Sequence, residues 1–379
     1  MNGMRTFMPA ITIFVVSFLI IHQFNLTLWG EFVAYLLVVN LIAHVINWGS
    51  KEYLIRQFSK KPYEITNVFY TNLFSRGILL VVGCMALLLF FEVAITLWLS
   101  IWLIGLFFYQ SSESLIIYAK KFRLQLVSEV VALLITVSYV LLNMDLSVVQ
   151  IIQIFTIVTW LKALVMFFSI YPKQATFRVR LDELKYSLPF FIIGLSGLLQ
   201  SRVDQYIIAA NCDKETIATY QLFFSAFILL QSLSAIIFVP FNKTIYRIGI
   251  GSFQRVQVKI LLLSTLLILL LTPCICIVLI YFFQLEIDFT FYLFGALFAF
   301  PPFIYVPIIY LFYRVKKEKE IMYVNYIGAA FNLLLTYYFV LYGNPYNAII
   351  ASVVAQWAML FWYSYRKKAI IDEIKMSRL

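Results

Sequence analysis

Long runs of apolar residues alternate with short polar segments along almost the whole chain. A helix needs about 20 apolar residues to cross a bilayer, because lipid offers no partners for backbone polar groups. The runs therefore predict an all-α polytopic membrane protein with about twelve spans. The expected ranges are 7–24, 28–48, 74–91, 95–118, 126–143, 148–170, 188–210, 217–240, 258–283, 289–313, 322–342 and 347–365. Stretches such as 260–271 lack the alternation of a membrane barrel.

The positions of the cations predict the orientation. Short cytoplasmic loops keep Lys and Arg, whereas translocated loops carry few of them. All but three of the 29 Lys and Arg residues fall at the termini or in every second connection, with Arg76 counted there as part of the first turn of its span. The exceptions are Lys214 in an outer connection, and Lys162 and Arg202 inside spans. We therefore expect both termini in the cytoplasm.

The basic segment after the sixth span divides the chain into two sets of six helices. We expect an N-terminal bundle over 1–171, a cytoplasmic linker over 172–187 and a C-terminal bundle over 188–379. An even number of spans in each half predicts a parallel repeat. Prolines interrupt the ninth and tenth spans, where we expect kinks: Pro273, Pro301, Pro302 and Pro307.

Composition narrows the class of protein. The chain is 63% hydrophobic and 12% charged, against about 45–50% and about 25% in soluble domains, which excludes a soluble globular protein. The net charge of +11 follows from the inner connections, so we expect no nucleic-acid partner. Two histidines and four scattered cysteines lack the neighbours of a metal or catalytic site. We expect no metal, no cofactor and no enzymatic activity, a profile typical of a transporter.

Three ionisable residues lie deep in the predicted spans. Lys162 and Arg202 each lie about 12 Å from the nearer span end, and a charge at such depth costs about 2.5–3.5 kcal/mol on insertion scales. Asp204 projects about 200° away from Arg202, so the two cannot pair on a regular helix. Gln200 shares the face of Asp204, and Tyr206 shares that of Arg202. A cationic lumen suits an anionic substrate.

Three glutamates lie nearer to span ends. Glu31, Glu113 and Glu129 are each within roughly one to one and a half turns of an end. Exposure at the membrane interface is the favoured interpretation for all three. Glu113 is also kept as a candidate coupling carboxylate.

Several motifs are spread along the chain: Trp29-Gly30-Glu31-Phe32, Trp48-Gly49-Ser50-Lys51-Glu52-Tyr53-Leu54-Ile55-Arg56, Ser187-Leu188-Pro189, Gln200-Ser201-Arg202-Val203-Asp204-Gln205-Tyr206, Ile217-Ala218-Thr219-Tyr220, Asn332 and Asn347-Ala348-Ile349-Ile350-Ala351. They resemble the Wzx-type polysaccharide flippases of the multidrug/oligosaccharidyl-lipid/polysaccharide (MOP) exporter superfamily. The resemblance covers nearly the whole chain. The sequence departs from the family at His22-Gln23, where a cation often ends the first helix, and this puts a first-helix substrate contact in doubt.

The resemblance implies two six-helix bundles in a V that rock between inward-open and outward-open states in the bacterial inner membrane. It implies as substrate an undecaprenyl-pyrophosphate-linked oligosaccharide, for O-antigen or capsule synthesis. Membrane lipids and the polymerase and chain-length regulator of that pathway are the implied partners. In this scheme Arg202, Lys162, Arg56, Gln200 and Tyr206 bind substrate. Asp204 and Glu113 couple transport to an ion gradient.

Other functions stay open. A drug/cation antiporter of the same superfamily should favour carboxylates over cations in the lumen. A membrane-embedded glycan-modifying or polymerising enzyme should need a long outer loop, and none of the expected outer connections exceeds about seven residues. A scaffold protein has no use for charge at bilayer depth.

Overall fold

The computed structural model describes residues 2–172, 177–238, 250–285, 288–315 and 317–376, and regular structure in these ranges is helical throughout. Ten helices in the described ranges are long and apolar enough to cross a membrane, and a shorter apolar helix covers Met8–Gln23. This confirms an all-α, multi-pass membrane protein. The chain forms two compact units, Met1–Leu195 and Ser196–Leu379.

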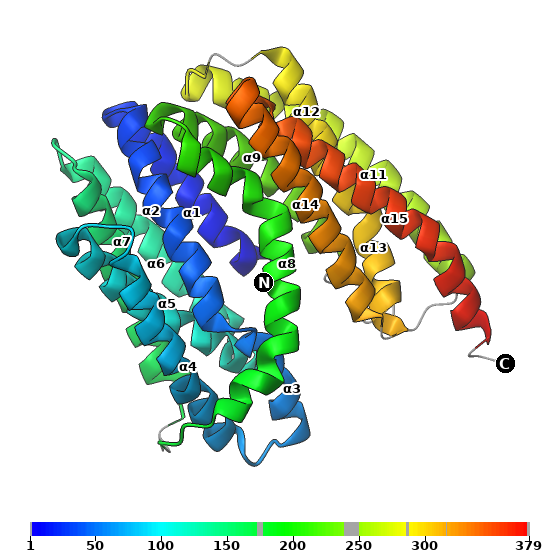
Figure 1. Cartoon of the computed structure of the whole chain (residues 1–379), viewed down its shortest axis with the longest axis horizontal. Coiled ribbons are helices and arrows are strands. Elements are labelled where there is room, and N and C mark those ends of the chain that lie inside the picture. Colours follow the sequence, from blue (N-terminus) through cyan, green and yellow to red (C-terminus); the bar gives the residue numbers. More distant parts are fainter. Residues whose placement is uncertain (1, 173–176, 239–249, 286–287, 316, 377–379) are drawn as a thin grey trace. The chain divides into compact units, whose positions relative to one another are not determined.

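The first unit is a bundle of seven helices and the start of an eighth. Within it α5 packs along α7, α1 against α6, and α2 against both α4 and α5 (Figure 1). The bounds are α1 Asn2–Gln23, α2 Leu26–Asn47, α3 Ser50–Lys60, α4 Ile65–Leu87, α5 Val93–Ala119, α6 Phe122–Leu142, α7 Val148–Ile170 and α8 Leu181–Asn211. The division between the units falls inside α8.

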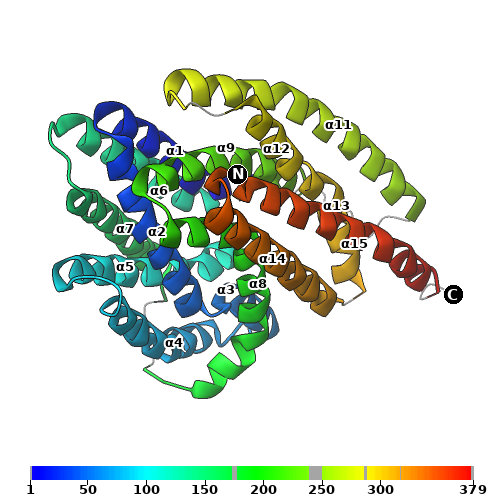
Figure 2. The same ribbon diagram turned by 45° about the horizontal axis from the view of Figure 1, so that its top comes forward.

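The second unit is built around α15. This helix packs against α12, α13 and α14, and α9 packs against α12 and α13 (Figure 2). The bounds are α9 Lys214–Phe238, α11 Ile250–Ile277, a π-helical turn η2 Val278–Phe282, α12 Phe289–Ala299, α13 Pro301–Arg314, α14 Glu318–Tyr342, a 3₁₀ turn η3 Pro345–Asn347 and α15 Ala348–Met376.

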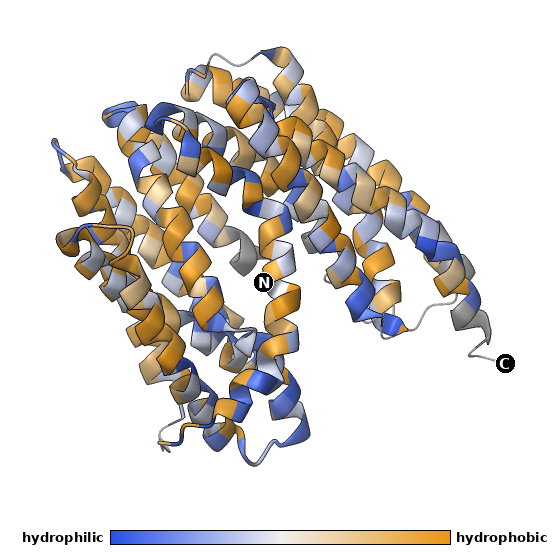
Figure 3. Ribbon diagram, in the orientation of Figure 1, coloured by the Kyte–Doolittle hydropathy of each residue, from blue (hydrophilic) through white to orange (hydrophobic). Residues whose placement is uncertain are grey.

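The apolar runs predicted most helix positions closely. The sixth span matches α7 Val148–Ile170 at both ends, and Ser147 and Gln150 cap the start of the helix reciprocally. The expected end of the eighth span, Pro240, and the inner cations Lys173, Lys243, Arg247, Lys316 and Arg378 lie outside the described residues. Figure 3 shows apolar residues predominating along the helices of each unit. Their many exposed aliphatic and aromatic side chains fit contact with lipid.

The prolines of the ninth and tenth spans have different effects. Pro301 and Pro302 lie where the tenth span breaks into α12 and α13 at Phe300. Proline has no N–H to donate, so it is accommodated at a helix start. Pro273, by contrast, lies inside α11 without ending it, and the helix gives way to the η2 turn only after Ile277.

A further helix, α3, follows the expected span 28–48. It covers Ser50–Lys60 in the inner connection and buries Tyr53, Leu54 and Phe58. Trp48 and Gly49 both have positive φ, 48° and 64°, which turns the chain from α2 into α3.

Gly49 is required at this turn by both conformation and space. A Cβ atom there would lie 2.4 Å from the backbone nitrogen of Phe191, besides needing a positive φ. The Trp48 ring stacks on Phe191 at 4.1 Å, and its indole nitrogen donates to the Leu184 carbonyl at 2.8 Å. The Trp48-Gly49 motif therefore fastens the end of α2 to the start of α8.

Candidate functional site

Asp204 is the centre of a buried polar cluster in the second unit. Its carboxylate is fully buried on α8. One oxygen accepts hydrogen bonds from the Tyr220 hydroxyl of α9 at 2.5 Å and the Ser352 hydroxyl of α15 at 2.9 Å, and the other accepts from the Gln205 backbone N–H at 2.9 Å. All three donors are neutral. Within the described residues, no cation lies within ion-pair distance of this carboxylate.

The cluster continues from α15 to α14. The Asn332 amide nitrogen donates to the Ser352 hydroxyl at 3.2 Å, and the Asn332 amide oxygen lies 3.4 Å from the same hydroxyl. Thr336 donates to that amide oxygen at 3.0 Å. Three residues from two helices thus form one continuous hydrogen-bonded chain that ends on Asp204. Buried polar groups of this kind hold helices together where lipid gives no hydrophobic drive.

Close packing of α14 on α15 brings these residues together. Gly328 of α14 has no side chain, and a Cβ there would lie 2.8 Å from the Met359 sulfur of α15. Small residues let membrane helices approach in this way. The same position also faces Gln200, whose Cγ would be 3.4 Å from the Cβ. Gln200, predicted to bind substrate, is buried at this contact.

Arg202 lies two residues from Asp204 and has different surroundings. Its guanidinium donates to the Gln205 side-chain oxygen at 3.1 Å and acts electrostatically on Tyr206, and the residue is part-exposed. In the described ranges no carboxylate lies within ion-pair distance of it. Among the described residues, Arg202 therefore has no counter-charge, in a helix that the sequence predicts to span the membrane, where an uncompensated charge is costly.

The first unit holds a second buried carboxylate, Glu129 of α6. This residue is 2% exposed, so the expectation that it lies at the membrane interface is wrong. The Tyr109 hydroxyl of α5 donates to one carboxylate oxygen, and the Lys162 ammonium of α7 lies 3.1 Å from the other. Lys162 also lies over the Tyr109 ring, 4.6 Å from its centroid. A cation therefore neutralises this carboxylate inside the bundle.

Arg76 is a second correction in the first unit. Expected near the cytoplasmic surface, it lies well inside α4 and is 1% exposed. Its Nε donates to Asn72 at 2.9 Å and its terminal nitrogen to Ser111 at 2.8 Å, with the Phe107 ring 5.1 Å away. α4 begins at Ile65 rather than at 74. The first turns of α4 contain polar residues, so the apolar run that predicted this span begins only at residue 74.

The other predicted residues occupy simpler positions. Arg56 is exposed on α3. Glu113 of α5 pairs with Lys51 of α3 at 2.8 Å, and both side chains are partly exposed. The sequence reading missed Tyr220 and Ser352 as partners of Asp204. The sequence held one signal for them: Tyr220 ends the motif that begins at Ile217, and Ser352 directly follows the motif that ends at Ala351.

Comparison with known proteins identifies the fold. The sequence matches no protein-family model and no curated protein. Among solved structures, the chain is similar to the inward-facing conformation of a multidrug resistance MATE family transporter of the MOP superfamily, with a TM-score of 0.59, 12% identity, and 95% of each chain covered. The outward-facing conformation of a MATE family transporter gives a TM-score of 0.51 and 14% identity over 97% of this chain and 94% of that chain. The chain thus has the fold of the MATE transporters.

Proposed function

We propose that this protein is an exporter of the MOP type that moves a lipid carrying an anionic oligosaccharide-pyrophosphate head across a bacterial inner membrane. The MATE fold supports the transport part of this proposal, since solved proteins with that fold are described as transporters. The anionic substrate is supported by the Arg202 guanidinium of α8, whose hydrogen-bond acceptor is a neutral amide. The lipid tail can stay in the bilayer while the polar head passes the barrier.

The surroundings of Arg202 are the single observation that favours an anionic substrate over a cationic one. Its guanidinium has the Gln205 amide oxygen as its hydrogen-bond acceptor and no carboxylate within reach in the described residues. A planar guanidinium binds phosphate oxygens in pairs, which suits a pyrophosphate. Tyr206, on the same face of α8 as Arg202, is the proposed neighbour of the head group. Gln200 lies on the face of Asp204 and is buried against Gly328, so its proposed contact with the substrate requires the helices to separate there.

Lys162 contributes to this function through the bundle rather than by direct contact. Its ammonium is already bound to Glu129 and packed on Tyr109. Releasing it to hold a head group would leave the Glu129 carboxylate buried and unpaired, at a cost of several kcal/mol. We therefore assign substrate contact to Arg202 first. Arg56 remains a proposed contact at the cytoplasmic mouth.

Asp204 is the proposed coupling carboxylate. It is buried among neutral donors, so binding a proton or a cation removes a charge that nothing else in its described surroundings balances. Such a group suits a step in which an ion drives the return of the carrier. Glu113, paired with Lys51 at a partly exposed site, is the weaker candidate.

The test uses Arg202→Ala in cells deleted for the native gene. We expect surface polysaccharide to fall at least tenfold at normal protein abundance, because the head group loses its bidentate partner. Arg202→Lys should restore part of the loss, since it keeps the charge. The matched control is Arg255→Ala, which removes an exposed arginine of α11 in the same unit. Polysaccharide at the wild-type level in R202A rules out the proposal.

A drug/cation antiporter is the second candidate, and Asp204 is the observation that favours it. A buried carboxylate with neutral partners can bind a cationic solute as well as a coupling ion. This function predicts that Asp204→Asn abolishes uptake of a cationic dye into inside-out vesicles while R202A leaves uptake intact. Dye uptake that is absent in the wild type, or that D204N leaves intact, excludes it.

A further inference from the structure

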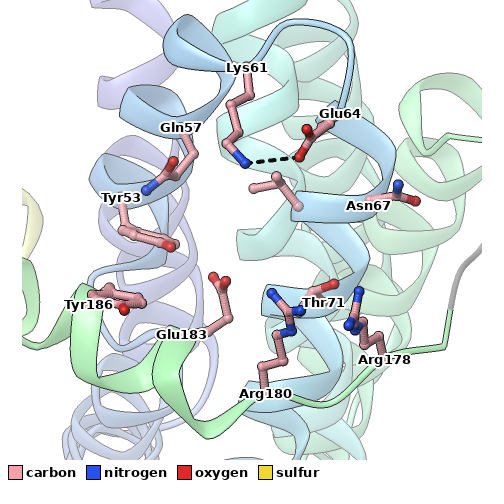
Figure 4. Close-up of a pocket in the computed structure, with 11 residues that line it drawn as sticks. Tyr53, Gln57, Lys61, Glu64, Asn67, Thr71, Arg178, Arg180, Glu183 and Tyr186 are labelled. Atoms are coloured by element: carbon pink, nitrogen blue, oxygen red, sulfur yellow. Dashed lines mark hydrogen bonds and ion pairs between the residues drawn. The ribbon is translucent and has the colours of Figure 1, made fainter.

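A polar cavity of about 470 Å³ lies in the first unit, and Glu129 is not among the residues that line it. It is bounded by α3, by the first turns of α4, by the segment 177–180 and by the start of α8 (Figure 4). Apart from Val68, the residues that line it are polar or charged: Tyr53, Gln57, Lys61, Glu64, Asn67, Thr71, Arg178, Arg180, Glu183 and Tyr186. Its size is that of a small-molecule site.

The two arginines of this cavity come from a segment that is fixed in place. The Arg180 backbone nitrogen donates to the Ser75 hydroxyl of α4 at 2.9 Å. Phe177 packs on Phe74 with ring centroids 4.7 Å apart. These contacts hold the segment along α4. Figure 4 shows the guanidinium groups of Arg178 and Arg180 close together on the side of the cavity nearest Thr71.

Some of the charged side chains in the cavity have an oppositely charged partner, and others do not. Lys61 pairs with Glu64 at 3.1 Å. In the described part of the chain, neither Arg178 nor Arg180 has a carboxylate within ion-pair distance. Glu183 is half-buried, and burial raises its pKa above the usual range, an effect that the Tyr53 hydroxyl and the Arg180 charge partly offset. Two adjacent arginines are thus left to bind an anion.

We propose that this cavity is a binding site for a phosphate or pyrophosphate group, held by Arg178 and Arg180. Two guanidinium forks side by side match the oxygens of such a group, and the Thr71 hydroxyl lies between them as a neutral donor. The proposal does not depend on the substrate proposed for Arg202, which belongs to the second unit. The phosphate comes either from a lipid head group at the interface or from a soluble compound, since basic pockets of membrane bundles bind lipid head groups.

Binding of two probes to the full-length protein in neutral detergent tests the site. Inorganic pyrophosphate is titrated by calorimetry, and phosphatidic acid is measured by native mass spectrometry against phosphatidylcholine. We expect R178A/R180A to weaken pyrophosphate binding at least tenfold, and R178K/R180K to fall between it and the wild type. K60A/R123A is the matched control, because it removes two exposed cations of the same unit that do not line the cavity, and it should change binding less than twofold.

The two probes also separate the sources of the phosphate. Phosphatidic acid retained by the wild type and lost in R178A/R180A indicates a lipid head group, whereas binding of pyrophosphate alone indicates a soluble ligand. Glu183→Gln should strengthen binding of either probe, because it removes an acid that faces the cavity. The proposal is overturned if neither probe binds, or if R178A/R180A binds pyrophosphate as the wild type does. This test measures binding and not surface polysaccharide. A negative result here would therefore leave the proposed export function untouched.

Discussion

In the described residues, each unit buries one carboxylate that accepts a hydrogen bond from a tyrosine hydroxyl, but the two carboxylates are stabilised differently. Glu129 in the first unit accepts from Tyr109 and is neutralised by Lys162. Asp204 in the second accepts from Tyr220, Ser352 and a backbone N–H, all neutral. A neutralised pair resists any change of charge, because losing one partner strands the other. An uncompensated carboxylate gains when it binds a proton or a cation.

The largest expected effect is the loss of one partner of the Glu129 pair. Glu129→Ala leaves the Lys162 ammonium buried without a counter-charge, which costs about 3–5 kcal/mol. We expect a fall in Tm of roughly 10 °C for a unit of this size, measured by fluorescence-detected size exclusion after heating. The E129Q/K162M double variant should regain most of the loss. If the double variant is as unstable as E129A, the pair is not the stabilising unit.

The second effect comes from Asp204 and should be smaller. Asp204→Ala leaves neutral hydroxyl donors unpaired, at a cost of about 1–3 kcal/mol. Asp204→Asn keeps an acceptor and removes the uncompensated charge, so its Tm should equal or exceed that of the wild type. The same heating assay measures both variants. A D204N variant less stable than D204A would show that a hidden cation balances Asp204, and the comparison of the units would fail.

The smallest effect concerns Glu183, a carboxylate outside the membrane-spanning segments. Its pKa is raised by burial, so the folded state holds the proton more tightly than the unfolded state. Below the unfolded-state pKa the carboxyl is protonated, and its burial does not lower the free energy of unfolding. As pH rises through the raised pKa, the buried carboxyl ionises and the free energy of unfolding falls. Glu183→Gln should raise Tm by about 1–2 °C at pH 8 and leave it unchanged near pH 4. A Tm difference that does not grow with pH would contradict this assignment.

The sequence predicted the helices far better than the contacts within them. The ends of α7 followed from a single long apolar run, Val148–Ile170. α3 is not among the expected spans because Tyr53, Leu54 and Ile55 form only a short apolar run among charged and polar residues. Arg76 was placed at the surface because Asn72, which binds it, made the start of α4 look like a loop.

Buried charge pairs were beyond the reach of sequence reading for a related reason. Lys162 was singled out as too deep for the membrane interface, but its partner Glu129 lies on another helix, 33 residues away. Nothing local marks that pairing. The Asp204 cluster likewise joins α8 to α9 and to α15. Depth identified the unusual residues, and only the packing of the helices shows which of them are already satisfied.

The Ser352 hydroxyl has a single proton and two acceptors within reach, the Asp204 carboxylate at 2.9 Å and the Asn332 amide oxygen at 3.4 Å. It can serve one of them at a time. An ionised Asp204 attracts this proton most strongly, and a neutral Asp204 releases it toward α14. Rotation of the Ser352 hydroxyl thus links the two helices. When Asp204 of α8 binds a proton or a cation, the hydrogen bonding of Asn332 on α14 changes as well.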